Sequence, residues 1–299
     1  MRKSILFGFG LGMIFSTGTL ATAQQPTAGP PPVLQIVRED IKTGMMEAHS
    51  REANATVRIW AKAKSPHHRL ALVPVAGNEN EVMYFWGFDS MAAFGKAQQD
   101  LDKIGVTYKA DFDRTRHSGE DYHSAQREMI ARLRPDLSYN GPADIAHSRF
   151  MRVETIRVRP GHASEFEEAR KIMSAAHEKA KVDEHMAVYQ VMGGTQAGTY
   201  IVLIPWKSLA EADGVQPLPH GKAYQDALGE SGTKKIASLS SDSIVFNDVS
   251  IYAFNPQLSY VFKEWVDADP GYWTLKPISA PGPAPAKKKA PAKADEKKQ

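Results

Sequence analysis

The feature that most constrains this sequence is an internal repeat, in which the landmarks of one half recur in the same order in the other. A strand-like run that ends in glycine, Val33–Gly44, lies 117 residues before a similar run, Phe150–Gly161. Further pairs follow at spacings of 117 to 121 residues: Lys62-Ala63-Lys64 with Lys179-Ala180-Lys181, His68 with His185, Gly77 with Gly194, Ser90 with Ser208, and Leu137-Ser138-Tyr139 with Leu258-Ser259-Tyr260. A fixed period marks a repeated structural unit, so we expect one α+β unit of roughly a hundred residues, present twice in tandem.

Each copy shows the same succession of patterns. The opening strand stops at a glycine that lets the backbone turn, and small apolar residues then recur at helical spacing. Ser90 and Ser208 are each placed to cap a further helix, and a second helical stretch with the Leu-Ser-Tyr segment closes the unit. The order β-α-β-β-α-β is that of a ferredoxin-like unit. The expected helices are 45–64 and 162–181, and the expected strands include 69–76, 81–88, 186–192 and 199–206.

The third strand of each copy is apolar on both of its alternating faces. Val82–Phe88 and Tyr200–Trp206 are almost free of polar side chains. A sheet that is covered by helices on one side only normally shows polar residues on the other. Both faces therefore need burial, and the simplest assembly places the two sheets face to face within one chain.

This pattern resembles the dimeric α+β barrel superfamily, including its antibiotic-biosynthesis monooxygenase-like and NIPSNAP-like domains. The resemblance rests on the element order, the doubly apolar third strand, and the strand–glycine–helix openings Ile41–Gly44 and Val158–Gly161. It implies an α+β fold in which two tandem ferredoxin-like units, 33–145 and 146–275, form an intrachain dimeric α+β barrel. Members of the superfamily include cofactor-free monooxygenases, haem-handling enzymes and proteins without known activity, so the fold alone does not assign a reaction.

The two ends of the chain predict export. Residues 1–23 combine Arg2 and Lys3, an apolar run and Ala21-Thr22-Ala23, which is typical of a signal peptide cleaved before Gln24. We expect a Pro-rich lead-in over 24–32, a disordered Pro/Ala/Lys tail over 276–299, and a periplasmic or secreted location. The apolar run is too short to span a bilayer, and the chain has no cysteine for a lipid anchor, a disulfide or a thiolate ligand.

The net charge of +3 comes from these ends. The tail from Lys276 holds seven lysines against two acidic residues, and Arg2 and Lys3 add two further positive charges, which together leave a net charge of −4 for Gln24–Leu275. A body without a basic excess argues against nucleic acid as a partner. We expect instead a small apolar or aromatic molecule as partner, together with the option of a homo-oligomer.

The histidines are the first candidate site residues. His68 and His185 occupy equivalent positions before the second strand of each copy, where they are either pocket-edge acid/base groups or haem or metal ligands, or exposed loop histidines. His177 takes the place that Trp60 holds in the first copy, which suggests a pocket in one copy that the other fills. His117–His123 holds two histidines and two carboxylates, and we interpret it as a capped, solvated helix, so that no metal site is predicted.

The aromatic residues of the third strands are the second candidate group. Tyr84, Trp86, Phe88 and Trp206 form either the wall of a cavity for a flat ligand or plain barrel core. We expect the Leu-Ser-Tyr segments to close the barrel, because retention in both copies indicates an architectural role.

Three functions stay open from the sequence. The first is a small-molecule-binding or structural envelope protein without a cofactor. The second is a cofactor-independent monooxygenase-like oxidoreductase acting on a small aromatic or apolar compound. The third is a haem-binding protein with histidine as the axial ligand.

Overall fold

A computed structural model describes residues 29–115, 121–214 and 221–278 of the chain. The first half contains β1 (Val33–Ile41), α1 (Met46–Lys62), β2 (Leu70–Ala76), β3 (Glu81–Phe88), α2 (Met91–Thr107), α3 (Lys109–Thr115), β4 (His123–Leu133) and the 3₁₀ turn η1 (Pro135–Leu137). The second contains β5 (Phe150–Val158), α4 (Ala163–Ala180), β6 (Ala187–Gly193), β7 (Thr199–Trp206), η2 (Leu209–Gly214), α5 (Gly221–Ser243), β8 (Ile244–Phe254), α6 (Lys263–Ala268) and α7 (Pro270–Trp273). The signal peptide and the lysine-rich tail predicted from the sequence lie outside the described residues.

The eight strands form one closed barrel in the order β1-β3-β2-β8-β5-β7-β6-β4. Within each half three pairs are antiparallel neighbours, and the halves meet through β2 with β8 and through β4 with β6. The two sheets are thus joined edge to edge rather than simply stacked. Closure leaves no strand at an open edge, and it brings the inner faces of both sheets around a common interior.

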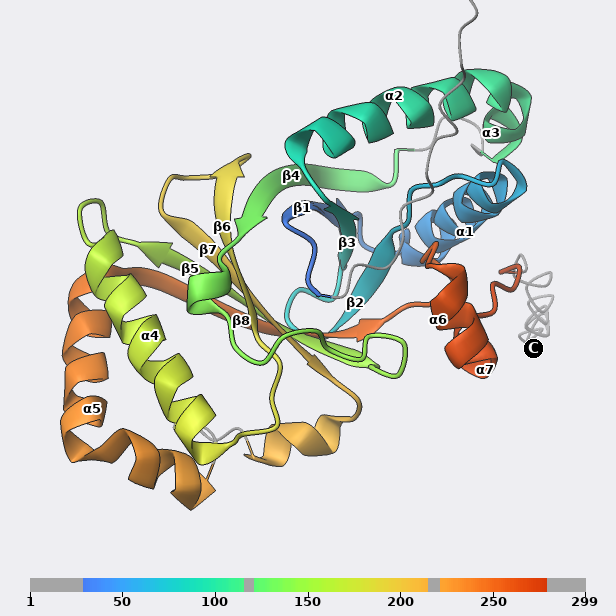
Figure 1. Cartoon of the computed structure of the whole chain (residues 1–299). Coiled ribbons are helices and arrows are strands. Elements are labelled where there is room, and N and C mark those ends of the chain that lie inside the picture. The colour runs from blue at the N-terminus through green and yellow to red at the C-terminus, as the bar shows by residue number, and fades with distance from the viewer. Residues whose placement is uncertain (1–28, 116–120, 215–220, 279–299) are drawn as a thin grey trace, which may run out of the picture.

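Alternation along the strands separates two apolar layers. Met83 and Phe85 of β3 point into the barrel, while Val82 and Tyr84 point outward under α1. This explains why the third strands are apolar on both faces: one face fills the barrel and the other supports helices. Figure 1 shows α1, α2 and α3 beside the first half, and α4 with α5 packed side by side on the second.

Most boundaries expected from the repeat agree with the structure. The first strands end in turns at Gly44 and Gly161, whose φ angles are 83° and 87°. Ser90 caps α2 by accepting a hydrogen bond from the Ala93 N–H at 3.1 Å. Ser208 differs, because the 3₁₀ turn η2 follows it rather than a long helix. In the described part of the chain, no helix has the length and apolar character that crossing a membrane requires.

The sequence analysis predicted no bounds for the last strand of each half. It is β4 or β8, which ends before the Leu-Ser-Tyr segment, while the segment itself contributes one isolated β-bridge. Both strands begin with several exposed residues, so their sequences lack the apolar alternation that marks a half-buried strand.

Candidate ligand-binding pocket

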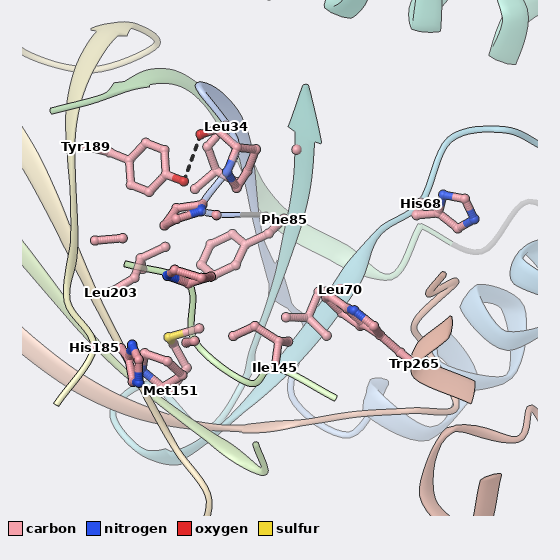
Figure 2. A pocket seen from close by; sticks show the side chains of 18 of the residues that line it. Leu34, His68, Leu70, Phe85, Ile145, Met151, His185, Tyr189, Leu203 and Trp265 are labelled. Atoms are coloured by element: carbon pink, nitrogen blue, oxygen red, sulfur yellow. Dashed lines mark hydrogen bonds between the residues drawn. The ribbon is translucent and has the colours of Figure 1, made fainter. Parts of the chain in front are cut away.

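A cavity of about 220 Å³ opens at one end of the barrel interior. It lies where β1, β2, β5 and β6 begin and where β3 and β7 end. Its wall consists of inward-facing side chains from both halves, which are mostly apolar: Leu34, Leu70, Phe85, Met151, Tyr189 and Leu203. Figure 2 shows these residues around the pocket.

Three segments cover this end of the barrel. They are the chain before β1, the loop around Ile145, and the stretch that leads into α6 with Trp265. The Tyr189 hydroxyl donates a hydrogen bond to the Pro31 carbonyl at 3.0 Å, and the Trp273 indole N–H donates to the Ala146 carbonyl at 2.7 Å. The first bond ties the cover to the barrel, and the second ties the loop around Ile145 to α7.

His68 lines the pocket immediately before β2. Its ring packs against Phe262 and Tyr260, with centroids 4.2 and 5.0 Å away. Burial, with a smaller contribution from His67, lowers the pKa of His68 to about 4, so the imidazole is neutral at pH 7. Its Nδ1 is buried and has no hydrogen-bond partner among the described residues. A neutral imidazole with a free nitrogen can donate or accept a hydrogen bond.

His185, the equivalent residue of the second half, also lines the pocket. Figure 2 shows the two histidines well apart, on opposite sides of the cavity. The Nδ1 of His185 is hydrogen-bonded to the Asn140 carbonyl oxygen. Because a carbonyl oxygen can only accept, Nδ1 carries the proton in this hydrogen bond.

The aromatic candidates of the third strands lie elsewhere. Tyr84 and Trp86 belong to the outer layer under α1, and Trp206 packs in the outer core of the second half. The guanidinium of Arg69 lies over the rings of Tyr84 and Trp60, at 4.2 and 4.5 Å from their centroids. None of these four aromatic residues lines the barrel-end pocket.

His177 is buried in α4, away from the pocket. Its Nδ1 lies 2.7 Å from the Met173 carbonyl, its ring packs against Tyr224 and Tyr139, and its Nε2 lies 3.4 Å from a Glu184 carboxylate oxygen. It therefore occupies the same layer as Trp60 in the first half, between helix and sheet.

The interpretation of His117–His123 as a solvated helix is wrong at its C-terminal end. Residues 117–120 lie outside the described part of the chain, and His123 begins β4 rather than lying on a helix. There its side chain meets Glu39 and His49, two residues that the sequence analysis did not single out.

No family model matches the chain, and no curated protein matches its sequence. Similar solved structures include a proposed monooxygenase from Lactobacillus acidophilus NCFM, with 11% identity, 75% of this chain and 94% of that chain covered, and a TM-score of 0.45. An anthrone oxidase-like protein has 14% identity, coverage of 75% and 92%, and a TM-score of 0.45. Chlorite dismutase from Candidatus Nitrospira defluvii has 8% identity, coverage of 80% and 95%, and a TM-score of 0.44. Likenesses at this level carry no information on reaction or ligand.

Proposed function

We propose that this protein is an exported binding protein that holds a small apolar or aromatic molecule in the barrel-end pocket. The observation that carries the proposal is the pocket itself: an apolar cavity, lined by both halves of the barrel, with two histidines at its rim. Apolar walls with a few placed polar groups are typical of small-molecule sites.

The chemistry of the lining defines the ligand class. An aromatic ring of a ligand would contact Phe85, Leu34 and Met151 in the walls. Burial of that ring away from water supplies the favourable free energy of binding. The imidazoles of His68 and His185, which line the pocket, offer a hydrogen bond to a hydroxyl or carbonyl group. A small aromatic compound with one such polar group satisfies both features.

Binding can be measured with N-phenyl-1-naphthylamine, a neutral fluorescent ring compound. Ala187 lines the pocket, so Ala187→Trp fills the cavity and is expected to weaken binding at least about tenfold, which corresponds to roughly 1.4 kcal/mol. Ala92→Trp places the same side chain on an exposed position of α2 and serves as the matched control. Equal affinity in a folded Ala187→Trp variant would exclude this pocket as the binding site.

A cofactor-independent oxidase is the second candidate, and the neutral, buried His68 favours it. Such a reaction needs a base that accepts the proton lost by an activated aromatic substrate before O₂ oxidises it. Consumption of O₂ by anthrone in the presence of the protein, abolished in His68→Gln, would support this alternative. Binding without O₂ consumption supports the non-catalytic proposal.

Haem fits the pocket poorly. A porphyrin is far larger than a cavity of about 220 Å³, and it carries two carboxylates that need cationic partners. Arg69 is the one cation among the lining residues, and its guanidinium is engaged with Tyr84 and Trp60 in the outer layer. A Soret band on reconstitution that is lost in His68→Ala or His185→Ala would reverse this conclusion.

We further infer that the two halves descend from one duplicated unit and that the chain is exported. The shared spacing of landmarks and the repeated order of strands and helices support the first inference. The composition of residues 1–23 supports the second. The mass of the mature protein recovered outside the cytoplasm tests export, because cleavage before Gln24 predicts an N-terminus at that residue.

A further inference from the structure

Three metal-ligand side chains from distant parts of the chain converge on the outer side of the first half. Glu39 comes from β1, His49 from the first turns of α1, and His123 from the start of β4. One ligand atom from each lies within 4.8 Å of the others. His49 Nε2 is 2.8 Å and His123 Nε2 is 3.3 Å from the same oxygen, Glu39 Oε2.

This geometry is close to that of a coordination sphere. Zinc bonds of about 2.0–2.1 Å in a tetrahedron hold their ligand atoms roughly 3.3 Å apart. The separation between His123 Nε2 and Glu39 Oε2 has this value, and the His49–Glu39 contact needs to lengthen by only a fraction of an ångström.

Protein partners alone do not account for the cluster. Only 4% of His49 is exposed, so its ring and the Glu39 carboxylate that it meets through Nε2 are largely shielded from water. His123 Nε2 is buried without a hydrogen bond in the described part of the chain, although it faces the carboxylate of Glu39. Burying two imidazoles and a carboxylate costs free energy, which a bound cation would offset.

The equivalent positions in the second half of the chain hold apolar side chains. The positions equivalent to Glu39 and His49, at the repeat spacing of 117 residues, are Ile156 and Phe166. A β-bulge interrupts the pairing at the same point in both halves, so that Ile41 opposes His123 and Val158 opposes Ile244. Ile156 and Phe166 belong to one apolar core cluster against which Ile244 packs. An apolar triad thus fills this place in the second half.

We propose that Glu39, His49 and His123 form a binding site for a divalent transition-metal ion, for which Zn²⁺ is the best match. Two imidazoles and one carboxylate are a ligand set that Zn²⁺ accepts, whereas Mg²⁺ and Ca²⁺ prefer oxygen ligands throughout. Three protein ligands leave a fourth position for water or another small ligand. His123, whose side chain is one-third exposed, provides the approach from solvent.

The site is independent of the proposed ligand pocket. Glu39 lies on the outer face of β1, whereas Leu34, from the inward-facing set of the same strand, lines the pocket inside the barrel. Loss of the metal site would therefore leave the binding of the apolar probe in place.

The second half supplies the test variants. Glu39→Ile, His49→Phe and His123→Ile each replace a ligand by the residue at the equivalent position. Isothermal titration of the chelator-treated full chain with Zn²⁺ is expected to show one saturable site per chain. Each substitution should weaken Zn²⁺ binding at least about 100-fold. Removing a residue that only hydrogen-bonds to a metal ligand typically weakens binding by about 10–100-fold, and removing the ligand itself should cost more. His147→Ala, which removes an exposed histidine away from the cluster, should bind as the wild type does.

Three further readouts separate metal binding from folding. Zn²⁺ but not Mg²⁺ should raise the melting temperature of the wild type and leave that of the variants unchanged. Co²⁺ should produce visible absorption bands that the variants lack. The triple variant rebuilds the apolar triad and is expected to fold with its helical circular dichroism intact. Absence of saturable Zn²⁺ and Co²⁺ binding in the wild type, or wild-type affinity in the folded triple variant, would overturn the proposal.

Discussion

Tyr260 and Arg69 exchange both of their backbone hydrogen bonds, at 2.8 and 2.9 Å, although they belong to opposite halves of the chain. The equivalent tyrosine of the first half, Tyr139, makes the same reciprocal pair with Met186, at 2.8 and 3.0 Å. Each Leu-Ser-Tyr segment thus holds the start of a strand in the other half. The expectation that these segments close the barrel is consistent with this arrangement, even though they are not its strands.

The tyrosine hydroxyls strengthen both junctions. Tyr260 donates to the Ser65 carbonyl at 3.0 Å, and Tyr139 donates to the Val182 carbonyl at 2.9 Å. Tyr260→Phe and Tyr139→Phe should each lower the free energy of unfolding by about 1 kcal/mol, since each leaves a carbonyl without its partner. The effects should add within about 0.5 kcal/mol in the double variant, because the junctions are separate. Urea unfolding measures this, and a double variant as stable as the wild type would contradict it.

A buried ion pair near the opposite end of the barrel gives a second prediction. The Glu81 carboxylate is 1% exposed and accepts hydrogen bonds from Arg38 and, at 2.8 Å, from the Tyr252 hydroxyl. The second half has threonine at both equivalent positions, Thr155 and Thr199. Arg38→Thr or Glu81→Thr alone should cost about 3–5 kcal/mol, because either leaves a buried charge unpaired.

The double variant Arg38→Thr/Glu81→Thr should cost less than the sum of the two, with a coupling of about 1–3 kcal/mol in a denaturation-based mutant cycle. Strictly additive losses would show that the pair contributes little beyond its separate contacts.

The turn between β6 and β7 gives a third prediction. Gly194 has a φ of 94°, and a Cβ added there would overlap the Glu128 carbonyl oxygen of β4. Gly44 has a similar φ of 83° but open space around it, so it is the matched control. Gly44→Ala should cost about 1 kcal/mol from backbone strain alone. Gly194→Ala should cost about 1–3 kcal/mol more, because β4 or β6 must move. Equal losses in thermal unfolding would contradict this reading of the turn.

The sequence predicted many local elements well because similar patterns recur in the two halves of the chain. Strands such as 81–88 and helices such as 45–64 carry their period within a few residues, so their bounds could be read directly. The closure of the barrel, in which β2 pairs with β8 and β4 pairs with β6, could not be predicted. Pairing between strands that are distant in the chain leaves no local sequence pattern.

The candidate site residues also divide into those that a sequence pattern reveals and those that depend on contacts between distant parts of the chain. His68 and His185 were found because they recur at equivalent positions, and both line the pocket. Tyr84 was proposed for a cavity wall. Alternation along a strand separates its two faces, but when both faces are buried it does not show which of them borders a cavity. The metal-ligand cluster was missed because Glu39 and His123 lie far apart in the chain. A sequence signal for the cluster was present, however. Polar Glu39 and His49 stand at the positions where the second half has apolar Ile156 and Phe166.

The depressed pKa of His68 predicts how stability depends on pH. Burial lowers this pKa from 6.5 to about 4, so the unfolded chain binds a proton at a higher pH than the folded protein does. The stabilising contribution is present in full above pH 6.5 and is lost as the pH falls toward about 4. The loss amounts to at most about 3 kcal/mol. His68→Gln cannot titrate, so its free energy of unfolding should decline less between pH 7 and pH 4.5. The remaining decline should keep the same sign, because burial also lowers the pKa of His67. Urea unfolding at several pH values measures both slopes, and parallel curves for the two proteins would show that His68 titrates alike in the folded and unfolded chains.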